Sequence, residues 1–428
     1  MLYDLYRRII PFAAPFLRLL IAYRIWKGRE EPRHKGEREG IATIKRPAGH
    51  ILWVHAASVG EMQSILPLIR HLLDQNKDLT CLITTVTVTA ARLVRNLKDP
   101  RILHQYVPFD CPSWVKAFLD HWKPNAAVWL ESELWPTMLH ALKDRKVPLM
   151  MVNGRISARS ATRWSNNAPE GACAILGLFD AILAQSDSDA MRLTGLGAKG
   201  VIVAGNMKFS RPPLPYDESA LRTLQESIGA RPVVLFASTH DGEEEMAGRI
   251  FKDLAVTRPD LLVIIMPRHA SRGEAIMEKL DDEGILAVRR SQNQPIKADT
   301  QIYIADTMGE PGIFFRLAPI VYIGNSLITS PGGGHNPIEA AQLGCAIVYG
   351  PHMWNFAQIE HDLRMANAAI MVQREGELSR AFDQLLSNPD RVAAMGAAAK
   401  GFVDAQNGVL EKVNTHLRPI LARAGIAA

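Results

Sequence analysis

Cysteine is scarce in this chain of 428 residues, and its four cysteines are widely scattered. Cys81, Cys111, Cys173 and Cys345 form no Cys-x-x-Cys pair, which argues against a zinc cluster or a disulfide framework and fits a reducing compartment. A strong excess of charge is also lacking, because 49 Lys and Arg stand against 44 Asp and Glu. With 47% hydrophobic and 22% charged residues, the composition is that of a globular protein without long disorder.

The small basic excess belongs to the N-terminal segment. Residues 1–48 hold eleven Lys or Arg and five Asp or Glu, a balance of +6, which leaves 38 basic against 39 acidic residues for 49–428. A nucleic-acid groove would need a basic stripe on the folded body, so nucleic acid is not expected as a partner.

The same segment lacks an apolar run long enough to span a bilayer cleanly. Residues 9–26 are mostly apolar, but Arg18 and Arg24 interrupt them, and a spanning helix needs about 20 apolar residues. No small-residue cleavage site follows convincingly. We expect an interfacial helix, with apolar side chains in the acyl boundary and basic side chains on anionic head groups. The alternatives are a short signal-anchor, or a terminal helix packed on its own domain or on a partner.

From residue 51 onward, short apolar runs alternate with polar loops and helical stretches, a pattern typical of a parallel sheet covered by helices. The candidate strands are 51–55, 79–84, 126–130, 148–152, 181–184 and 201–204 in the first half, and 233–237, 261–266, 301–305, 320–323 and 346–349 in the second. Pro212, Pro213 and Pro215 break the pattern between the halves.

The chain is also longer than a single core usually is. We therefore predict a membrane-associated segment at 1–48, a Rossmann-like acceptor domain at 49–209 and a linker at 210–216. A second Rossmann-like domain follows at 217–428, and its last helix could pack back on the first domain. Ligands are expected in a cleft that faces the carboxyl ends of both sets of strands.

The strongest local signal is a glycine-rich turn. Residues 331–339 read Pro-Gly-Gly-Gly-His-Asn-Pro-Ile-Glu, after one candidate strand and before a helical stretch at 337–343. Such a turn exposes backbone N–H groups to a phosphate, Pro337 suits a first helical turn, and Glu339 could reach ribose hydroxyls. Arg268-His269 and Met308-Gly309-Glu310 follow other strands and face the same edge, so this half is predicted to bind a nucleotide.

In the first half, acidic residues follow the strands. Glu61 opens the first helix, where a carboxylate can act as a general base or merely complement the helix dipole. Glu131 and Glu133 follow a later strand and could bind sugar hydroxyls or hold a basic side chain. Arg155 and Arg159 follow the next one and suit carboxylate or phosphate recognition, with a solvated loop as the alternative.

Three further patterns are set aside. Residues 195–200 match Gly-x-Gly-x-x-Gly but follow a helical stretch, so they do not indicate nicotinamide binding. Residues 56–60 resemble a nucleophile elbow but begin with alanine, and a serine hydrolase fits a two-domain layout poorly. Asp187-Ser188-Asp189 resembles a metal-binding triplet, but helix capping explains it, so no metal or other cofactor is expected.

Together the motifs resemble the 3-deoxy-D-manno-octulosonic acid (Kdo) transferases, in order and with similar spacing. The matching segments are 55–61 (HAASVGE), 131–136 (ESELWP), 153–160 (NGRISARS), 267–269 (PRH) and 333–340 (GGHNPIEA). The resemblance implies an α/β fold of the GT-B type, with two Rossmann-like doubly wound domains facing a central cleft. It implies inverting transfer of Kdo from CMP-Kdo to a lipid A precursor, lipid IVA, in lipopolysaccharide core biosynthesis. The reaction would take place at the cytoplasmic face of the inner membrane, on an anionic membrane surface.

The resemblance also assigns roles to residues. Glu61 becomes the base that deprotonates the acceptor hydroxyl. Acceptor-binding or supporting residues are Ser58, Gly60, Glu131, Glu133, Arg155, Ser157 and Arg159, with at least one of the two glutamates essential. The residues placed at CMP are Arg268, His269, Met308, Gly309, Glu310, Gly334, His335, Asn336, Pro337 and Glu339. Two other classes stay open: a GT-B transferase or epimerase for another nucleotide sugar, and a non-enzymatic nucleotide-sensing module at the membrane.

Overall fold

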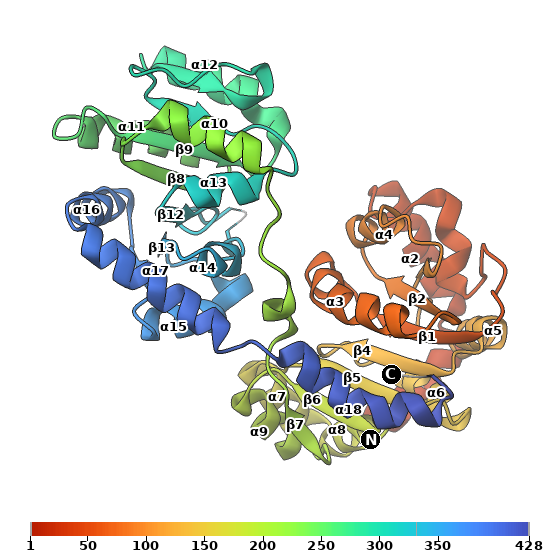
Figure 1. The fold of residues 1–428 in the computed structure, drawn as a ribbon. Coiled ribbons are helices and arrows are strands. Elements are labelled where there is room, and N and C mark those ends of the chain that lie inside the picture. The colour runs from red at the N-terminus through yellow and green to blue at the C-terminus, as the bar shows by residue number, and fades with distance from the viewer. Residues whose placement is uncertain (1, 331, 427–428) are drawn as a thin grey trace. The chain divides into compact units, whose positions relative to one another are not determined.

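The computed structural model describes residues 2–330 and 332–426, and it divides into two compact α/β units (Figure 1). The first unit comprises the chain up to Arg211 together with the segment that starts at Gln406. The second unit runs from Pro212 to Ala405. The last helix of the chain therefore belongs to the first unit, although the chain enters it from the second.

The first unit is built on a seven-stranded parallel sheet with the order β3-β2-β1-β4-β5-β6-β7. Its strands are β1 (His50–His55), β2 (Leu79–Thr85), β3 (Ile102–Tyr106), β4 (Ala126–Leu130), β5 (Leu149–Gly154), β6 (Ala181–Ala184) and β7 (Val201–Val203). The six predicted strands are confirmed to within one or two residues. β3 is missing from the prediction because it lies at the sheet edge, where Ile102 to His104 are only half-buried and the apolar run is short.

Helices cover both faces of this sheet. They are α3 (Val59–Gln75), α4 (Val88–Arg95), α5 (Pro112–Trp122), α6 (Pro136–Asp144), α7 (Ala158–Asn167), α8 (Pro169–Leu176), α9 (Asp187–Gly195) and α18 (Val409–Arg423), with a short 3₁₀ turn η3 (Met207–Ser210). One core joins α3 and α18 to the strands, and the other places α5 and α6 against Trp53 and Trp129. Val413, Leu417 and Leu421 of α18 are fully buried in the first of these cores.

The second unit repeats the plan, with the parallel order β10-β11-β9-β8-β12-β13-β14. Its strands are β8 (Val233–Thr239), β9 (Leu262–Pro267), β10 (Ala287–Arg289), β11 (Ile302–Ile304), β12 (Ile320–Ile323), β13 (Ala346–Tyr349) and β14 (Ala369–Met371). Again the strands absent from the prediction, β10 and β14, form the two edges and have three residues each.

The helices of the second unit include several short ones near the strand ends. They are α10 (Glu218–Ile228), α11 (Glu243–Ala255), η4 (Ala270–Arg272), α12 (Gly273–Asp282), η5 (Arg290–Gln292), α13 (Pro311–Leu317), α14 (Ile338–Gln342), η6 (Trp354–Phe356), α15 (Ala357–Met365), α16 (Glu375–Leu386) and α17 (Pro389–Asp404).

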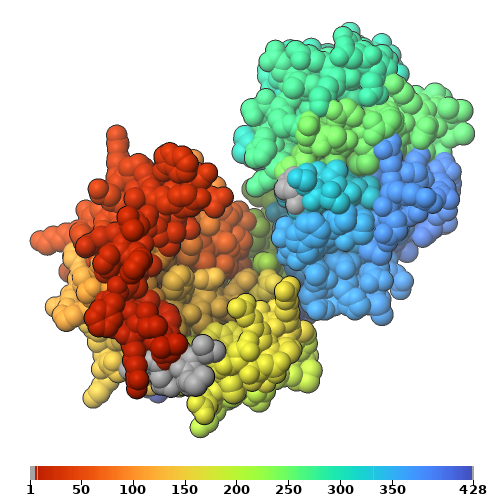
Figure 2. All heavy atoms as spheres, turned by 180° about the vertical axis from the view of Figure 1, so that it is seen from behind, coloured from red at the N-terminus to blue at the C-terminus, as the bar shows by residue number. Residues whose placement is uncertain are grey.

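The N-terminal segment folds as α1 (Leu2–Ile9), η1 (Ile10–Phe12), α2 (Ala14–Trp26) and η2 (Pro32–Glu39), on the surface of the first unit (red in Figure 2). None of the helices in the described ranges has the length and apolarity that crossing a bilayer requires. Ile21 of α2 is buried against Cys111 and Trp114, and the Tyr6 hydroxyl donates to Asp110 Oδ2 at 2.5 Å. The side chains that remain exposed include Phe12, Phe16, Leu19 and Trp26, which are 69–77% accessible.

The two arginines that interrupt the apolar run are engaged within the segment itself. Arg18 pairs with Glu39 at 2.8 Å and Arg24 with Glu30 at 2.9 Å. The basic side chains of this segment were expected to meet anionic head groups, and that stays a prediction. Glu30 precedes η2 and Glu39 is its last residue, and these two carboxylates partly neutralise the guanidinium groups of α2.

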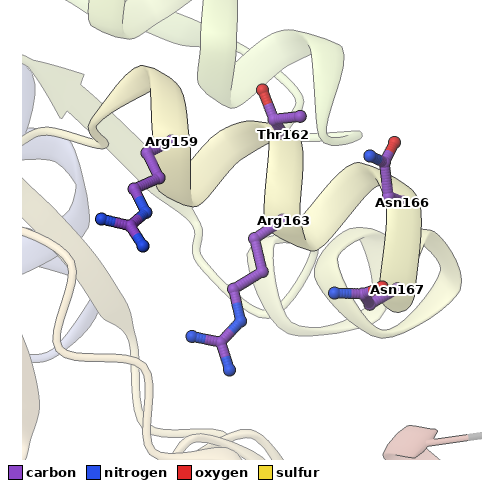
Figure 3. A pocket seen from close by; sticks show the side chains of 5 residues that line it. All are labelled: Arg159, Thr162, Arg163, Asn166 and Asn167. Carbon is purple, nitrogen blue, oxygen red and sulfur yellow. The ribbon is translucent and has the colours of Figure 1, made fainter.

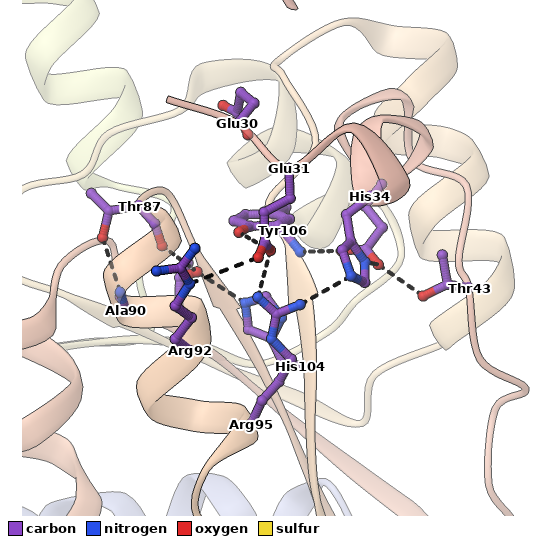
Figure 4. A network of polar contacts seen from close by, with 12 residues as sticks. Glu30, Glu31, His34, Thr43, Thr87, Ala90, Arg92, Arg95, His104 and Tyr106 are labelled. Carbon is purple, nitrogen blue, oxygen red and sulfur yellow. Dashed lines mark hydrogen bonds and ion pairs between the residues drawn. The ribbon is translucent and has the colours of Figure 1, made fainter. Parts of the chain in front are cut away.

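A polar network fastens residues 30–43 to the body of the first unit (Figure 4). Glu31 accepts from Tyr106 Oη at 2.6 Å and from Arg95, and Glu37 accepts from the Tyr106 backbone N–H at 2.7 Å. Beside them the buried Arg38 pairs with Glu30 at 2.9 Å and donates to the carbonyl of Val107 at 3.0 Å. Removing one partner of such a buried pair is costly, so this network fixes where the N-terminal segment sits on the sheet.

Candidate active site

Glu61 lies at the point in the first sheet where the strand order reverses. The chain leaves β1 toward β2 on one side, while β4 lies on the other side of β1, and doubly wound sheets bind ligands in a crevice at the carboxyl ends of two such strands. Ser58 caps α3, and its hydroxyl donates to Glu61 Oε1 at 2.8 Å. The backbone N–H of Ala57 donates to Glu61 Oε2 at 2.9 Å. These two bonds fix the carboxylate at the start of the helix.

The carboxylate of Glu61 is set up to hold or release a proton near neutrality. Burial disfavours its charged form and raises its pKa to about 7, the hydrogen bond from Ser58 opposes that rise, and the charges of Glu131 and Glu133 add to it. A group with a pKa near the working pH is a suitable general base. The helix-capping role and the chemical role are therefore compatible, because the same hydrogen bonds orient the carboxylate.

Glu131 and Glu133 come from the other side of the crevice, directly after β4. Glu131 adopts a left-handed backbone conformation with φ of 54°, which is uncommon for a residue other than glycine and clusters at functional sites. Its side chain lies 3.6 Å from Arg155 Nη1, at the end of β5. Glu133 accepts from the Trp135 indole at 3.2 Å, and burial raises its pKa.

Lys208 completes this cluster, and the sequence interpretation missed it. Burial lowers the pKa of Lys208, while the charges of Glu131 and Glu61 raise it and that of Arg155 lowers it, so all four groups share one electrostatic environment. Lys208 sits in η3, which is held by Asn153: Asn153 Oδ1 accepts from the backbone N–H of Met207 at 3.0 Å. The available signal was the segment Asn206-Met207-Lys208, which follows the strand at 201–204 after one glycine.

The other predicted residues of the first unit have more local positions. Ser157 caps α7 by accepting from the Ser160 N–H at 3.2 Å, which is a structural role. Gly60 is exposed in the first turn of α3, and Arg159 is exposed on α7. Neither of these two contacts the carboxylate cluster by any hydrogen bond or ion pair within the described ranges.

In the second unit, a group of imidazole rings gathers where its own strand order reverses, between β8 and β12. His335 Nε2 lies 2.9 Å from His240 Nε2, with the two rings stacked, and the His240 and His269 rings are 6.3 Å apart. Burial, His240 and Arg268 lower the pKa of His335 to about 4. The structure thus brings together Arg268, His269 and His335, which were predicted to lie at one edge of the second sheet. It adds His240 to this group.

His240 could have been found from the sequence, because Ser-Thr-His-Asp-Gly directly follows the strand at 233–237. Its loop is fixed by the buried Glu243, whose carboxylate accepts from the His240 N–H at 2.9 Å and from Tyr322 Oη at 2.7 Å. Glu243 also accepts from the Asn325 N–H at 2.8 Å, so one carboxylate connects the loops after β8 and β12.

The glycine-rich turn follows β12, although Pro331 lies outside the described residues. Gly332, Gly333 and Gly334 all have positive φ, at 66°, 101° and 68°. The N–H of Gly334 donates to the Asn325 carbonyl at 2.8 Å, so this amide is hydrogen-bonded within the turn itself.

The helix after the turn is shorter than expected. α14 begins at Ile338 and has five residues, with Pro337 preceding it, because Gly344 ends the helix with a positive φ. Asn336 accepts from the Ile338 N–H at 3.1 Å and donates to Glu339 at 3.3 Å. Asn336 and Glu339 are therefore joined to each other at the start of the helix.

The third segment predicted at the nucleotide site, residues 308–310, lies after β11. Glu310 binds Arg290 through two bonds of 2.6 and 3.1 Å, and that ion pair lowers the pKa of Glu310. Gly309 has a φ of 86°, and Met308 is 81% exposed. Met308 thus offers an open apolar side chain, while Glu310 is oriented by its arginine.

The patterns that were set aside also have clear positions. Gly195 ends α9, and Gly197 and Gly200 turn the chain into β7, as the order of elements predicted. Ser186 is the N-cap of α9, whereas the triplet Asp187-Ser188-Asp189 had been predicted to cap it; Asp187 and Asp189 lie in the first turn, and Asp189 accepts from the Ser186 hydroxyl at 2.6 Å. Ser58 donates to Glu61, and no hydrogen bond joins it to a histidine among the residues that the structure describes.

One acidic group in the described ranges has the spacing of metal ligands, namely Asp241, Glu244 and Glu245. Arg272 pairs with Asp241 and Glu244, and Lys279 with Asp241 and Glu245. Two protein cations therefore offset most of the charge of these three carboxylates.

Comparison with known proteins identifies the family. Residues 33–211 match the family model described as 3-deoxy-D-manno-octulosonic-acid transferase. The chain is 35% identical over 408 residues to a probable mitochondrial 3-deoxy-D-manno-octulosonic acid transferase of Arabidopsis thaliana, with 93% of this chain and 91% of the relative covered. It is 30% identical over 390 residues to the Haemophilus influenzae 3-deoxy-D-manno-octulosonic acid transferase, with 90% of each covered.

A solved structure shares the fold. The UDP-GlcNAc 2-epimerase of Neisseria meningitidis, bound to UDP-GlcNAc, matches with a TM-score of 0.56 at 15% identity and covers 86% of this chain and all of its own. Two parallel sheets covered by helices, reversing at β1/β4 and at β8/β12, form the α/β GT-B fold that was predicted. With relatives of 30–35% identity over about nine-tenths of its length, the chain belongs to the 3-deoxy-D-manno-octulosonic acid transferase family and is a glycosyltransferase.

Proposed function

We propose that the chain transfers Kdo from CMP-Kdo to the lipid A precursor lipid IVA, with inversion at the anomeric carbon and with Glu61 as general base. The observation that carries the proposal is the Glu61 carboxylate, buried at the β1/β4 crevice, oriented by Ser58 and Ala57, and with a pKa raised to about 7. The family model supports Kdo as the transferred group, and the CMP donor, the lipid acceptor and the place in lipopolysaccharide core biosynthesis are part of the proposal.

In this mechanism, an acceptor hydroxyl attacks the anomeric carbon of Kdo. The new C–O bond forms as the bond to the CMP phosphate oxygen breaks, CMP leaves with the electron pair, and the hydroxyl proton passes to Glu61. Glu131, Arg155 and Lys208 would hold the acceptor sugar or the reacting charge near the base. We assign the supporting acidic role to Glu131, because its charge acts on both Glu61 and Lys208.

The second unit would hold CMP. Arg268 would present positive charge, and the imidazole rings of His240, His269 and His335 would present hydrogen-bonding nitrogens, to a single phosphate at the carboxyl ends of β8, β9 and β12. A donor with one phosphate can be neutralised by these side chains, so the mechanism is drawn without a metal ion.

The N-terminal segment would bring the enzyme to the cytoplasmic face of the inner membrane. Its exposed apolar residues suit the acyl boundary. With Arg18 and Arg24 paired to carboxylates, attraction to anionic lipid falls to exposed residues such as Arg8, Lys27 and Arg29.

The test is product analysis by mass spectrometry. Purified full-length protein is incubated with CMP-Kdo and lipid IVA, and a panel of other nucleotide sugars serves as the comparison. The proposal requires Kdo-lipid IVA to form with CMP-Kdo and not with the panel. Turnover of another nucleotide sugar alone would overturn the donor assignment, and CMP binding with no turnover would indicate a sensing module.

A further inference from the structure

Helix α7 carries two arginines that have no hydrogen-bond or ion-pair partner among the described residues. Arg159 and Arg163 are four residues apart, so they share one face of the helix, and Figure 3 shows both guanidinium groups on the same side. Throughout the described ranges, neither guanidinium makes a hydrogen bond or an ion pair with another residue. Two like charges at this spacing disfavour a helix. The helix buries none of its own residues, so packing does not explain the pair.

Two cavities open beside this face. One has a volume of about 550 Å³ and is lined by Arg159, Thr162, Arg163, Asn166 and Asn167. The other, of about 450 Å³, is lined by Ser160, Arg163, Trp164, Asn167 and Ala168. Arg163 and Asn167 line both, and the lining contains no acidic side chain. The polar groups are hydrogen-bond donors that suit an anion with several oxygens.

Trp164 adds an apolar surface to the second cavity. Its ring is half-buried and packs against two cores of the first unit, which holds it in place. An indole face beside arginine and asparagine side chains is a combination that binds a sugar ring and its oxygen substituents. The helix also begins three residues after Arg155, which pairs with Glu131 in the acidic cluster.

We propose that α7 forms a subsite for a phosphorylated saccharide, in which Arg159 and Arg163 bind a phosphate group and Trp164 contacts the sugar ring. Planar guanidinium groups bind phosphate oxygens in pairs and supply specificity as well as affinity. The subsite rests on the proposed function, since the saccharide would be the headgroup of the lipid acceptor. Arg159 thereby gains a defined role, and Arg163 and Trp164 join the acceptor site.

The experiment measures acceptor kinetics and acceptor binding with full-length protein. Detergent-dispersed acceptor carrying its phosphate groups is compared with the same acceptor after phosphatase treatment. The variants are Arg163→Gln, Arg159→Gln and Arg163→Lys, and the control is Arg423→Gln, which removes an exposed arginine of α18 in the same unit. We expect each glutamine variant of α7 to raise the acceptor KM roughly tenfold on phosphorylated acceptor and not on dephosphorylated acceptor. The lysine variant should recover part of the loss.

Three results would overturn the subsite. The first is an unchanged KM on phosphorylated acceptor, and the second is an equal loss on both acceptors. The third is weaker sedimentation of the glutamine variants with anionic phospholipid vesicles that lack acceptor, which would make α7 a membrane contact. If the wild type transfers sugar to neither acceptor, the proposed function fails. Equilibrium binding of the two acceptors then decides the subsite, which requires phosphate-dependent binding that the glutamine variants lose.

Discussion

The chemistry assigned to Glu61 depends on a carboxylate that is partly buried and yet restrained by two donors. Glu61→Gln keeps the shape of the side chain but removes the basic oxygen. We expect kcat to fall roughly 10²–10⁴-fold while CMP binding is unchanged, since removal of a general base has effects of this size. Single-turnover kinetics together with CMP titration would show this. Activity within a few-fold of wild type would exclude Glu61 as the base.

The pH dependence of the reaction should follow the same carboxyl group. The base acts in its deprotonated form, so kcat/KM should rise with pH, level off above a pKa of about 7, and be lost as the pH falls below it. Glu131 raises this pKa, so Glu131→Gln should move the acidic limb to lower pH. Ser58 lowers it, so Ser58→Ala should move the limb to higher pH. Glu170→Gln, on the exposed start of α8, is the control. If Glu131→Gln and Ser58→Ala shift the acidic limb equally and in the same direction, the assignment of this limb to Glu61 is contradicted.

The charged form of Glu61 should also lower the stability of the folded protein. Its pKa is higher in the folded state than the usual 4.5, so the folded state binds more protons and loses stability as pH rises from about 4.5 to about 7. The loss is at most about 3 kcal/mol by the conversion of pKa to free energy. Glu61→Gln should therefore raise Tm at pH 8 more than at pH 5. Thermal unfolding at both pH values checks this; a variant that is less stable at pH 8 than wild type would contradict it.

At the scale of single elements, the sequence predicts buried strands well and edge strands poorly. Central strands such as β1 and β4 are continuous apolar runs, because helices cover both of their faces. β3, β10 and β14 lie at sheet edges, are half-exposed or very short, and give no such run. Glu61 and the glycine-rich turn were placed correctly after their strands. Lys208 and His240 were missed although both lie shortly after predicted strands, and the strand order is what shows which other loops lie beside theirs.

The turn before α14 requires a glycine at position 334, and a substitution can test this requirement. A Cβ at Gly334 would overlap Met353 Sδ, and the backbone φ of 68° adds strain. Gly334→Ala should therefore lower Tm and weaken CMP binding, because the turn cannot close against Met353. Gly284→Ala is the matched control, with a φ of 70° but open space around the new Cβ. Calorimetry and CMP titration of both variants separate steric overlap from backbone strain. Equal effects in the two variants would show that overlap is unimportant.

Substituting exposed side chains of the N-terminal helices tests membrane binding more specifically than deleting the helices does. Deleting residues 1–26 would also expose the surface around Cys111 and Trp114 that Ile21 covers. The double substitution Phe16→Glu and Leu19→Glu changes only exposed side chains, and it should reduce co-sedimentation with anionic vesicles while Tm stays unchanged. Arg18→Gln should leave the salt dependence nearly unchanged, since Arg18 is already paired with Glu39. Equal sedimentation of wild type and the double variant would move the membrane contact to the folded body.

For the whole molecule, the two units differ in how the chain builds them. The second unit is one continuous segment, whereas the first needs residues 406–428 after the chain has left it. α18 contributes Val413, Leu417, Ile420 and Leu421 to the core beside α3, and Asn414 binds His71 at 3.0 Å. A chain that ends at residue 405 should therefore retain a cooperatively folding second unit that binds CMP. Its first unit should lose several kcal/mol, because burial of each such side chain contributes about 1.5–3 kcal/mol.

Calorimetry of the truncated chain should show this asymmetry as one transition near its original temperature and one that is lowered or lost. Fusing residues 406–428 directly behind Arg211 is the matched control, because it returns α18 to the first unit with the second unit left out. That fusion should unfold cooperatively, whereas residues 1–211 alone should aggregate or expose apolar surface. If residues 1–211 alone unfold at the temperature of the fusion, α18 is dispensable, and the first unit is complete before the chain enters the second.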